Sequence, residues 1–247
     1  MRSPPHPDWI TPDWPAPRRV RALITTRAGG VSSGKFASLN LSARVGDDPQ
    51  CVARNRAILG ACLPADPAWV KQVHGTEVID AAHVTPDTEA DGVVTRSPGK
   101  VCAVMTADCL PVLLGDRAGR RAGIAHAGWR GLAGGVLENV VRAMDLPPQD
   151  LIAYIGPGIG ARRYEVGEDV HQAFVDRDPS GAASFEPHRN GTYFVDLYEL
   201  ARQRLAAAGV AEVHGGEFCT ATEERFFSFR RDQTTGRMAS LIWLEDS

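Results

Sequence analysis

Two residues that can do chemistry lie at the boundaries of neighbouring apolar runs. Cys109 separates VCAVMTA from LPVLL, and His126 closes the run in AGIAHAGWRG. Asp116 and Gly119 suit the first and fourth positions of a type I turn, which predicts a hairpin centred on residues 116–119. In that register Cys109 lies directly opposite His126, with Cβ atoms about 4.5–5.5 Å apart. If the loop is this short, the thiol and the imidazole can share one metal ion.

A catalytic zinc ion usually takes three protein ligands and leaves a fourth position open. His74 is the best third candidate, because His74 and Gly75 interrupt an expected strand in KQVHGTEV. A Cys/His/His set suits zinc and also accepts copper. A single buried cysteine is often only a small apolar residue, however, and a single histidine is often a hydrogen-bonded core residue. The spacing alone leaves both interpretations open.

Candidate anion-binding residues lie near glycine-rich turns. Arg130 follows His126 in HAGWRGLAGG, where a strand is expected to pass into a helix whose N-terminal amides favour anions. Arg27 lies in a second such stretch, TTRAGGVS. Close packing of strand on helix explains the same glycines equally well, and Trp129 is either a stacking surface for a base or a core residue. Neither stretch has the nucleotide-binding pattern GxxxxGK[ST].

Composition excludes several classes of protein. The chain has 247 residues, 43% of them apolar, and a formal net charge of −3. This near balance argues against nucleic acid as the main ligand. We expect neither a signal peptide nor a membrane span, because the sequence has no sufficiently long apolar stretch. Five cysteines, an odd number, favour free thiols in the cytoplasm, and we expect a monomer.

The pattern of apolar residues predicts a single catalytic domain at 20–247, preceded by a Pro-rich arm at 1–19. Strands are expected at 20–26, 68–80, 90–96, within 100–114 on either side of Cys109, within 151–160 before a Gly-Pro-Gly turn, and at 212–220, 225–231 and 236–245. Helices are expected at 48–63, 131–146, 165–176 and 195–210. Because the strands are grouped rather than regularly alternating with helices, the fold class is mixed α/β, with largely antiparallel or mixed sheets.

The sequence also resembles a known family. TTRAGGVS, LNLSARVGDD, KQVHGTEV, ADGVVT, TADCLPVLL, HAGWRG, IGPGIG and FFSFRRDQTTGRMASLIWL occur in this order. Together they resemble the YfiH/YlmD-type proteins, once described as polyphenol oxidases or laccases and also as peptidoglycan editing factors. The resemblance implies a layered α/β sandwich similar to toxin-type cysteine hydrolases. It also implies a zinc-dependent purine nucleoside phosphorylase that acts on adenosine, inosine, guanosine and S-methyl-5′-thioadenosine and deaminates adenosine.

The resemblance assigns the zinc ligands to His74, Cys109 and His126. Zinc lowers the pKa of bound water to about 7, which suits deamination. Asp108 is then either the proton-transferring carboxylate or a residue that orients a ligand. We expect phosphate and substrate to be bound by residues from four of the motifs: Arg27, Arg44, Gln72 and Arg130. Arg44 is a departure, because many members are expected to have histidine there.

Three alternatives remain. A copper-dependent polyphenol oxidase with several coppers needs many histidines, whereas this chain has seven and no His-x-His pair. A cysteine hydrolase would use Cys109 as nucleophile and His126 as base on cell-wall peptide or amide bonds. A non-enzymatic partner of a cell-wall or division complex would hold the metal for structure alone. Replacing His74 by alanine separates them, because hydrolysis can survive that change and zinc-dependent nucleoside cleavage cannot.

Overall fold

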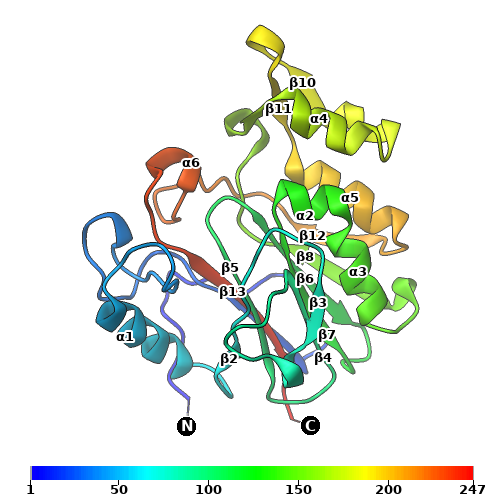
Figure 1. Ribbon diagram of the computed structural model, residues 1–247. Coiled ribbons are helices and arrows are strands. Elements are labelled where there is room, and N and C mark those ends of the chain that lie inside the picture. Colours follow the sequence, from blue (N-terminus) through cyan, green and yellow to red (C-terminus); the bar gives the residue numbers. More distant parts are fainter. Residues whose placement is uncertain (1, 247) are drawn as a thin grey trace.

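The computed structural model describes residues 2–246 and has a mixed α/β fold, as predicted (Figure 1). The strands are β1 (Val20–Ile24), β2 (Pro67–Ala68), β3 (Val78–Asp80), β4 (Gly92–Thr95), β5 (Val101–Thr106), β6 (Leu110–Asp116), β7 (Ala122–Ala127), β8 (Leu151–Ile155), β9 (Glu165–Val166), β10 (Phe185–Pro187), β11 (Tyr193–Val195), β12 (Glu212–Gly215) and β13 (Met238–Leu244). The helices are α1 (Pro49–Gly60), α2 (Trp129–Gly134), α3 (Val136–Ala143), α4 (Glu168–Val175), α5 (Leu197–Ala207) and α6 (Phe229–Asp232).

Two mixed sheets form the body of the molecule. One has the order β1-β13-β5-β2, and the other has the order β12-β8-β6-β7-β4-β3. Only the β2–β5, β3–β4 and β8–β12 pairs within them are parallel. A separate antiparallel sheet, β10-β11-β9, projects with α4 from one end of the body (Figure 1).

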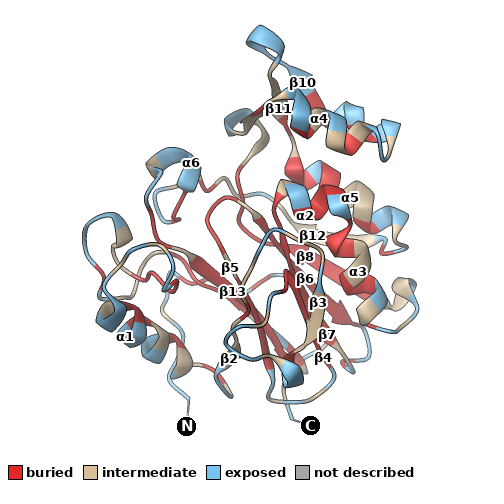
Figure 2. Ribbon diagram, viewed as in Figure 1, coloured by how far each residue is buried: buried red, intermediate tan, exposed pale blue. Residues whose placement is uncertain are grey.

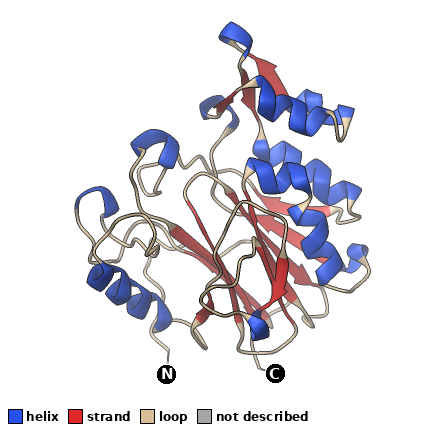
Figure 3. Ribbon diagram, viewed as in Figure 1, coloured by secondary structure: helices blue, strands red, loops and turns tan. Residues whose placement is uncertain are grey.

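The two large sheets pack face to face between helices. Strand β13 shows why, because its side chains alternate: Ile242 and Leu244 join the core between the sheets, whereas Leu241 and Trp243 face the α1 side. Helices α2, α3 and α5 cover the outer face of the six-stranded sheet (Figure 3). The strands of both sheets are therefore buried, while the outer helix faces are exposed (Figure 2).

The Pro-rich arm is built into the fold. The side chain of Trp9 is buried, and its Nε1 donates a hydrogen bond to the Ala28 carbonyl over 3.0 Å. Ile10 forms an antiparallel bridge with Ile24. The arm thus adds apolar area to the four-stranded sheet, and the division of the chain at residue 19 stays a prediction. None of the helices in residues 2–246 has both the length and the apolar surface needed to cross a bilayer.

Three of the expected elements differ most from the structure. The strand expected at 68–80 is mostly irregular and contributes only the ends β2 and β3. The helix expected at 131–146 is broken at Gly135, whose φ of +104° is left-handed and is best tolerated by glycine. The strand expected at 225–231 is a buried loop followed by α6, because the Ser228 side chain accepts a hydrogen bond from the Arg231 amide and caps this helix.

Candidate metal centre and substrate cavity

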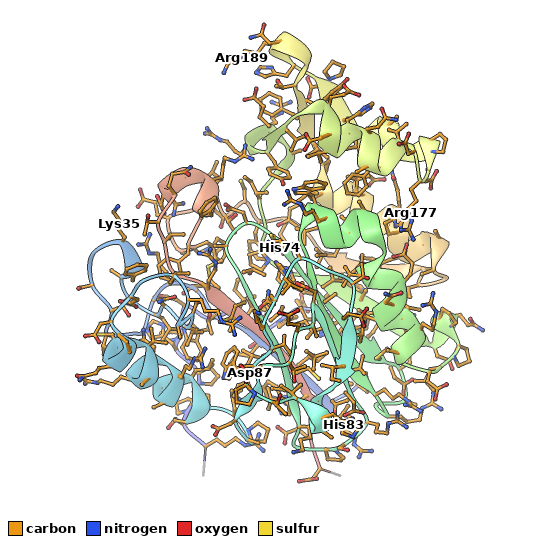
Figure 4. The ribbon with its side chains drawn as sticks, viewed as in Figure 1. Lys35, His74, His83, Asp87, Arg177 and Arg189 are labelled. Atoms are coloured by element: carbon orange, nitrogen blue, oxygen red, sulfur yellow. The ribbon has the colours of Figure 1, made fainter. Side chains whose placement is uncertain are left out.

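Three side chains from distant parts of the sequence meet near the middle of the molecule. His74 lies in the irregular segment before β3, Cys109 directly precedes β6, and His126 lies in β7. One ligand atom from each residue lies within 4.8 Å of the other two, and Cys109 Sγ is 3.9 Å from His74 Nε2. Figure 4 shows His74 at this central position, far from Arg189 at the projecting tip.

The hairpin forms, but the predicted register is wrong by two residues. The predicted turn is present, because the Gly119 amide donates to the Asp116 carbonyl over 2.8 Å, but the Asp116 amide donates to the Arg121 carbonyl over 3.1 Å, so the loop is longer than a two-residue turn. Pro111 is therefore the residue opposite His126. Cys109 remains close because it is a diagonal neighbour on the same face, and diagonal pairs stay within reach of longer side chains. The thiol and the imidazole are therefore close together, as predicted, although the predicted register is wrong.

A buried carboxylate that the sequence analysis missed positions both histidines. Asp91 accepts hydrogen bonds from the backbone amides of Val73, His74 and Gly75 over 3.1, 3.1 and 2.7 Å. Its Oδ1 also lies 2.7 Å from His126 Nδ1, which leaves Nε2 of that ring for a metal ion. One feature of the sequence could have indicated a role for Asp91: it is a charged residue directly before the apolar run in ADGVV.

The backbone adopts unusual conformations at the ligands. His74 has a φ of +59° and Asp108 a φ of +92°, both in the left-handed region that non-glycine residues rarely adopt. Gly128 is needed for space, because a Cβ there would lie 3.0 Å from both Cys109 Sγ and His74 Cδ2. Such strain persists only where the surrounding structure enforces it, and it is common at functional sites.

The charges of the three residues depend on one another. Burial raises the pKa of the Cys109 thiol, but the charge and hydrogen bond of His126, followed by those of His74, lower it from 9.0 to about 6. Burial lowers the pKa of His126, yet the charge of Cys109 and the hydrogen bond to Asp91 raise it to about 9. The protein therefore favours a thiolate at Cys109, which is the form that attacks as a nucleophile or binds a metal.

The donor set fits a metal ion. Ligands at about 2.0–2.3 Å from zinc, at tetrahedral angles, lie about 3.3–3.8 Å apart. The observed separations, up to 4.8 Å, need only a small contraction to reach this range. Within residues 2–246, no second group of three such side chains lies as close together. The site thus provides three ligands for one ion.

A cavity of about 520 Å³, here called the metal cavity, opens over the three ligands. This volume lies in the range of small-molecule sites, about 300–1,000 Å³. Four arginines line it: Arg44, Arg130, Arg230 and Arg237. Asp108 is the single Asp or Glu among its lining residues. The metal cavity is consequently suited to an anion such as phosphate.

Aromatic side chains complete the wall. Trp129, Tyr164 and Phe229 all line the metal cavity, and Phe229 is 50% exposed. The guanidinium of Arg130 lies 4.3 Å from the Trp129 ring, and that of Arg230 lies 4.9 Å from the Tyr164 ring. Such surfaces can stack on a planar base while the adjacent cations contact an anion.

The Asp108 carboxylate is already engaged on both oxygens. Oδ1 accepts a 2.6 Å hydrogen bond from the hydroxyl of Thr220, and Oδ2 accepts one of 2.6 Å from the Arg230 amide. These contacts hold Arg230 and the segment of Thr220 against the metal ligands. Neither partner is a metal ligand, so the role of Asp108 in proton transfer or in orienting a ligand stays a prediction.

Two of the predicted substrate-binding residues have other partners. The Gln72 amide lines the metal cavity, but it both donates to and accepts from the Met105 backbone over 2.8 Å, which anchors the His74 segment to β5. Arg27 is not among the residues lining the cavity; its Nε donates to the Ala37 carbonyl over 2.7 Å and its guanidinium packs over Phe227. In contrast, Arg230 and Arg237 line the metal cavity although neither is among the four substrate-binding residues predicted from the motifs.

Comparison with known proteins places the chain among relatives of similar length. Residues 21–245 match the family model described as multi-copper polyphenol oxidoreductase laccase. A purine nucleoside phosphorylase of Pseudomonas aeruginosa is 51% identical over 240 residues, covering 96% of this chain and 99% of that protein. The purine nucleoside phosphorylase YfiH of Escherichia coli is 50% identical over 239 residues, covering 95% and 98%. The chain belongs to the YfiH family.

Solved structures agree with this membership, which confirms the family predicted from the motifs. A protein of Neisseria meningitidis has a TM-score of 0.94 at 52% identity, covering 97% of this chain and 100% of that one. YlmD from Geobacillus stearothermophilus has a TM-score of 0.85 at 34% identity and covers 93% of each chain. The mixed α/β fold is therefore shared with these two proteins.

Proposed function

We propose that the protein is a zinc-dependent purine nucleoside phosphorylase. The observation that carries the proposal is the convergence of His74, Cys109 and His126 beneath a cavity lined by four arginines and three aromatic rings. The two relatives at 51% and 50% identity bear the name purine nucleoside phosphorylase, which supports this reaction class. The lining chemistry matches its two substrates, because arginines bind phosphate and aromatic rings stack on bases.

In phosphorolysis, an oxygen of phosphate forms a bond to ribose C1′ while the bond from C1′ to the purine nitrogen breaks. The electron pair leaves with the base, which then takes up a proton. Arg44 and Arg130 are the best candidates for holding phosphate, because within residues 2–246 neither guanidinium has a hydrogen-bonding or carboxylate partner. Bringing phosphate and nucleoside together in one orientation supplies a large part of the rate enhancement.

Zinc, when bound by the three ligands, supplies a Lewis acid that lowers the pKa of water to about 7, as deamination of adenosine requires. We include this second activity in the proposal, with adenosine, inosine, guanosine and S-methyl-5′-thioadenosine as phosphorolysis substrates. The five free thiols suit the cytoplasm, where we expect a monomer to act. Copper is the alternative ion for the same ligands.

The test is to incubate metal-analysed protein with each nucleoside, with and without phosphate. We expect about one zinc ion per chain, free base only when phosphate is present, and slow conversion of adenosine to inosine without phosphate. His74→Ala removes a ligand and should lower zinc content and phosphorolysis by more than about 100-fold. His83→Ala, an exposed control (Figure 4), should change neither. Absence of turnover for every purine nucleoside would exclude the proposal.

A cysteine hydrolase is the second candidate, and one arrangement favours it. Cys109, His126 and Asp91 are ordered as nucleophile, base and orienting carboxylate, with Asp91 on the far nitrogen of the imidazole. Such an enzyme would cleave amide bonds of cell-wall precursors without zinc. It would keep its activity in His74→Ala and in the presence of a chelator, which is opposite to the phosphorylase prediction.

A further inference from the structure

A second cavity adjoins the metal cavity and has no role in the proposed reaction. Its volume is about 440 Å³, and four residues line both cavities: Ser42, Arg44, Val70 and Met105. It lies between the loop that carries Arg44, helix α1, and the segments around β2 and the start of β5. We call it the side cavity. Because the two cavities share four lining residues, they lie next to each other, and Arg44 lies between them.

The side cavity carries unmatched positive charge. Arg44, Arg56 and Lys100 line it, against one carboxylate, that of Asp66. Within residues 2–246, none of these four side chains takes part in a salt bridge. Burial lowers the pKa of Arg56, and the positive charge of Arg44, which lines the same cavity, lowers it further. Cations held near one another without a partner favour an anionic ligand.

Most of the remaining wall of the side cavity is apolar. Ala68, Trp69 and Val70 form one side, and the Arg56 guanidinium lies 4.9 Å from the Trp69 ring. The Nε of Arg56 also donates to the Leu41 carbonyl over 2.9 Å, which restrains the side chain while its terminal nitrogens stay available. An arginine held in place before binding loses less conformational entropy when it contacts a phosphate.

We propose that the side cavity binds a group of the phosphate class through Arg44, Arg56 and Lys100. The group is either the 5′-phosphate of a nucleotide whose nucleoside part occupies the metal cavity, or a free phosphate ion. This inference rests on the proposed function only for the identity of the nucleoside part. It extends the substrate class from nucleosides to nucleotides, and it gives a second role to Arg44, which lines both cavities and lies where the family pattern leads us to expect histidine.

The test measures binding rather than turnover, by calorimetry with adenosine, adenosine 5′-monophosphate and inorganic phosphate. For a bound 5′-phosphate, we expect the wild-type protein to bind the monophosphate about tenfold more tightly than adenosine. Lys100→Met and Arg56→Met should each remove most of that difference and leave adenosine binding unchanged. Lys35→Met removes one charge at a distant site (Figure 4) and should have no effect. The difference should also shrink at high salt.

For a free phosphate ion, the two variants should weaken phosphate binding, while adenosine and its monophosphate bind alike. If neither Lys100→Met nor Arg56→Met weakens the binding of phosphate or of the monophosphate, the inference is overturned. Urea unfolding of each variant checks that it is folded. Adenosine phosphorolysis is assayed on the same samples. Its absence from the wild-type protein would contradict the proposed function, whereas the binding result would still decide on the side cavity.

Discussion

Replacing Asp91 by asparagine tests whether one carboxylate assembles the metal centre. Oδ1 of Asp91 faces the His74 amide and His126 Nδ1, while Oδ2 faces the amides of Val73 and Gly75. An asparagine in either orientation places its NH₂ group against two of these four nitrogens. Two hydrogen bonds to a charged group are thus lost, each contributing about 1.5–3 kcal/mol. We expect a loss of at least about 3 kcal/mol in the free energy of unfolding.

The same change should weaken zinc binding, because the His126 ring and the His74 segment lose their support. Removal of such supporting carboxylates commonly lowers metal affinity by about 10–100-fold. Urea unfolding of the metal-free protein gives the stability, and chelator competition gives the affinity. Asp87→Asn, at an exposed loop position (Figure 4), is the matched control and should change neither quantity.

The pH dependence adds a further check on Asp91. Burial opposes its ionisation, but the hydrogen bond and charge of His126, followed by the backbone amides, lower its pKa in the folded protein. A group whose pKa is lowered by folding stabilises the protein above its ordinary pKa and loses that effect as the pH falls. The stability difference between wild type and Asp91→Asn should therefore be complete at pH 7 and shrink below about pH 4. A stability loss under 0.5 kcal/mol with zinc affinity within about threefold of wild type would refute the reasoning.

Three further predictions concern the thiol, the space around it and the phosphate. In metal-free protein, alkylation of Cys109, followed by mass spectrometry, should rise with pH through about 6; a midpoint near 9 would contradict the thiolate. Gly128→Ala should lower zinc affinity more than tenfold by crowding the ligands, whereas Gly60→Ala, whose nearest new contact is at 3.9 Å, should not; equal affinities would contradict the packing argument. Arg130→Met should raise KM for phosphate about tenfold with little change in stability, and Arg189→Met is its control; an unchanged KM would remove Arg130 from the phosphate site.

The sequence by itself determined the local features of this protein. The unbroken apolar run at 241–244 indicates a strand buried on both sides, and in the structure Leu241 and Trp243 lie on one face and Ile242 on the other. The apolar runs on either side of residues 116–119 predict a hairpin, and they place Cys109 and His126 at the same end of it. Residue type and short-range spacing carry this information because they act within one strand or one turn.

Only the tertiary structure decided which distant residues share the site. Nothing near Asp91 in the sequence indicates that its carboxylate binds the amides around His74 and the ring of His126. The sequence around Arg237 likewise gives no indication that this residue lines the metal cavity. Arg237 precedes β13, and the pairing of β13 with β5 brings it there. These contacts depend on how the two sheets pack together and on loop conformations such as the left-handed backbone of His74. Both are determined by long-range packing, which the local sequence pattern does not specify.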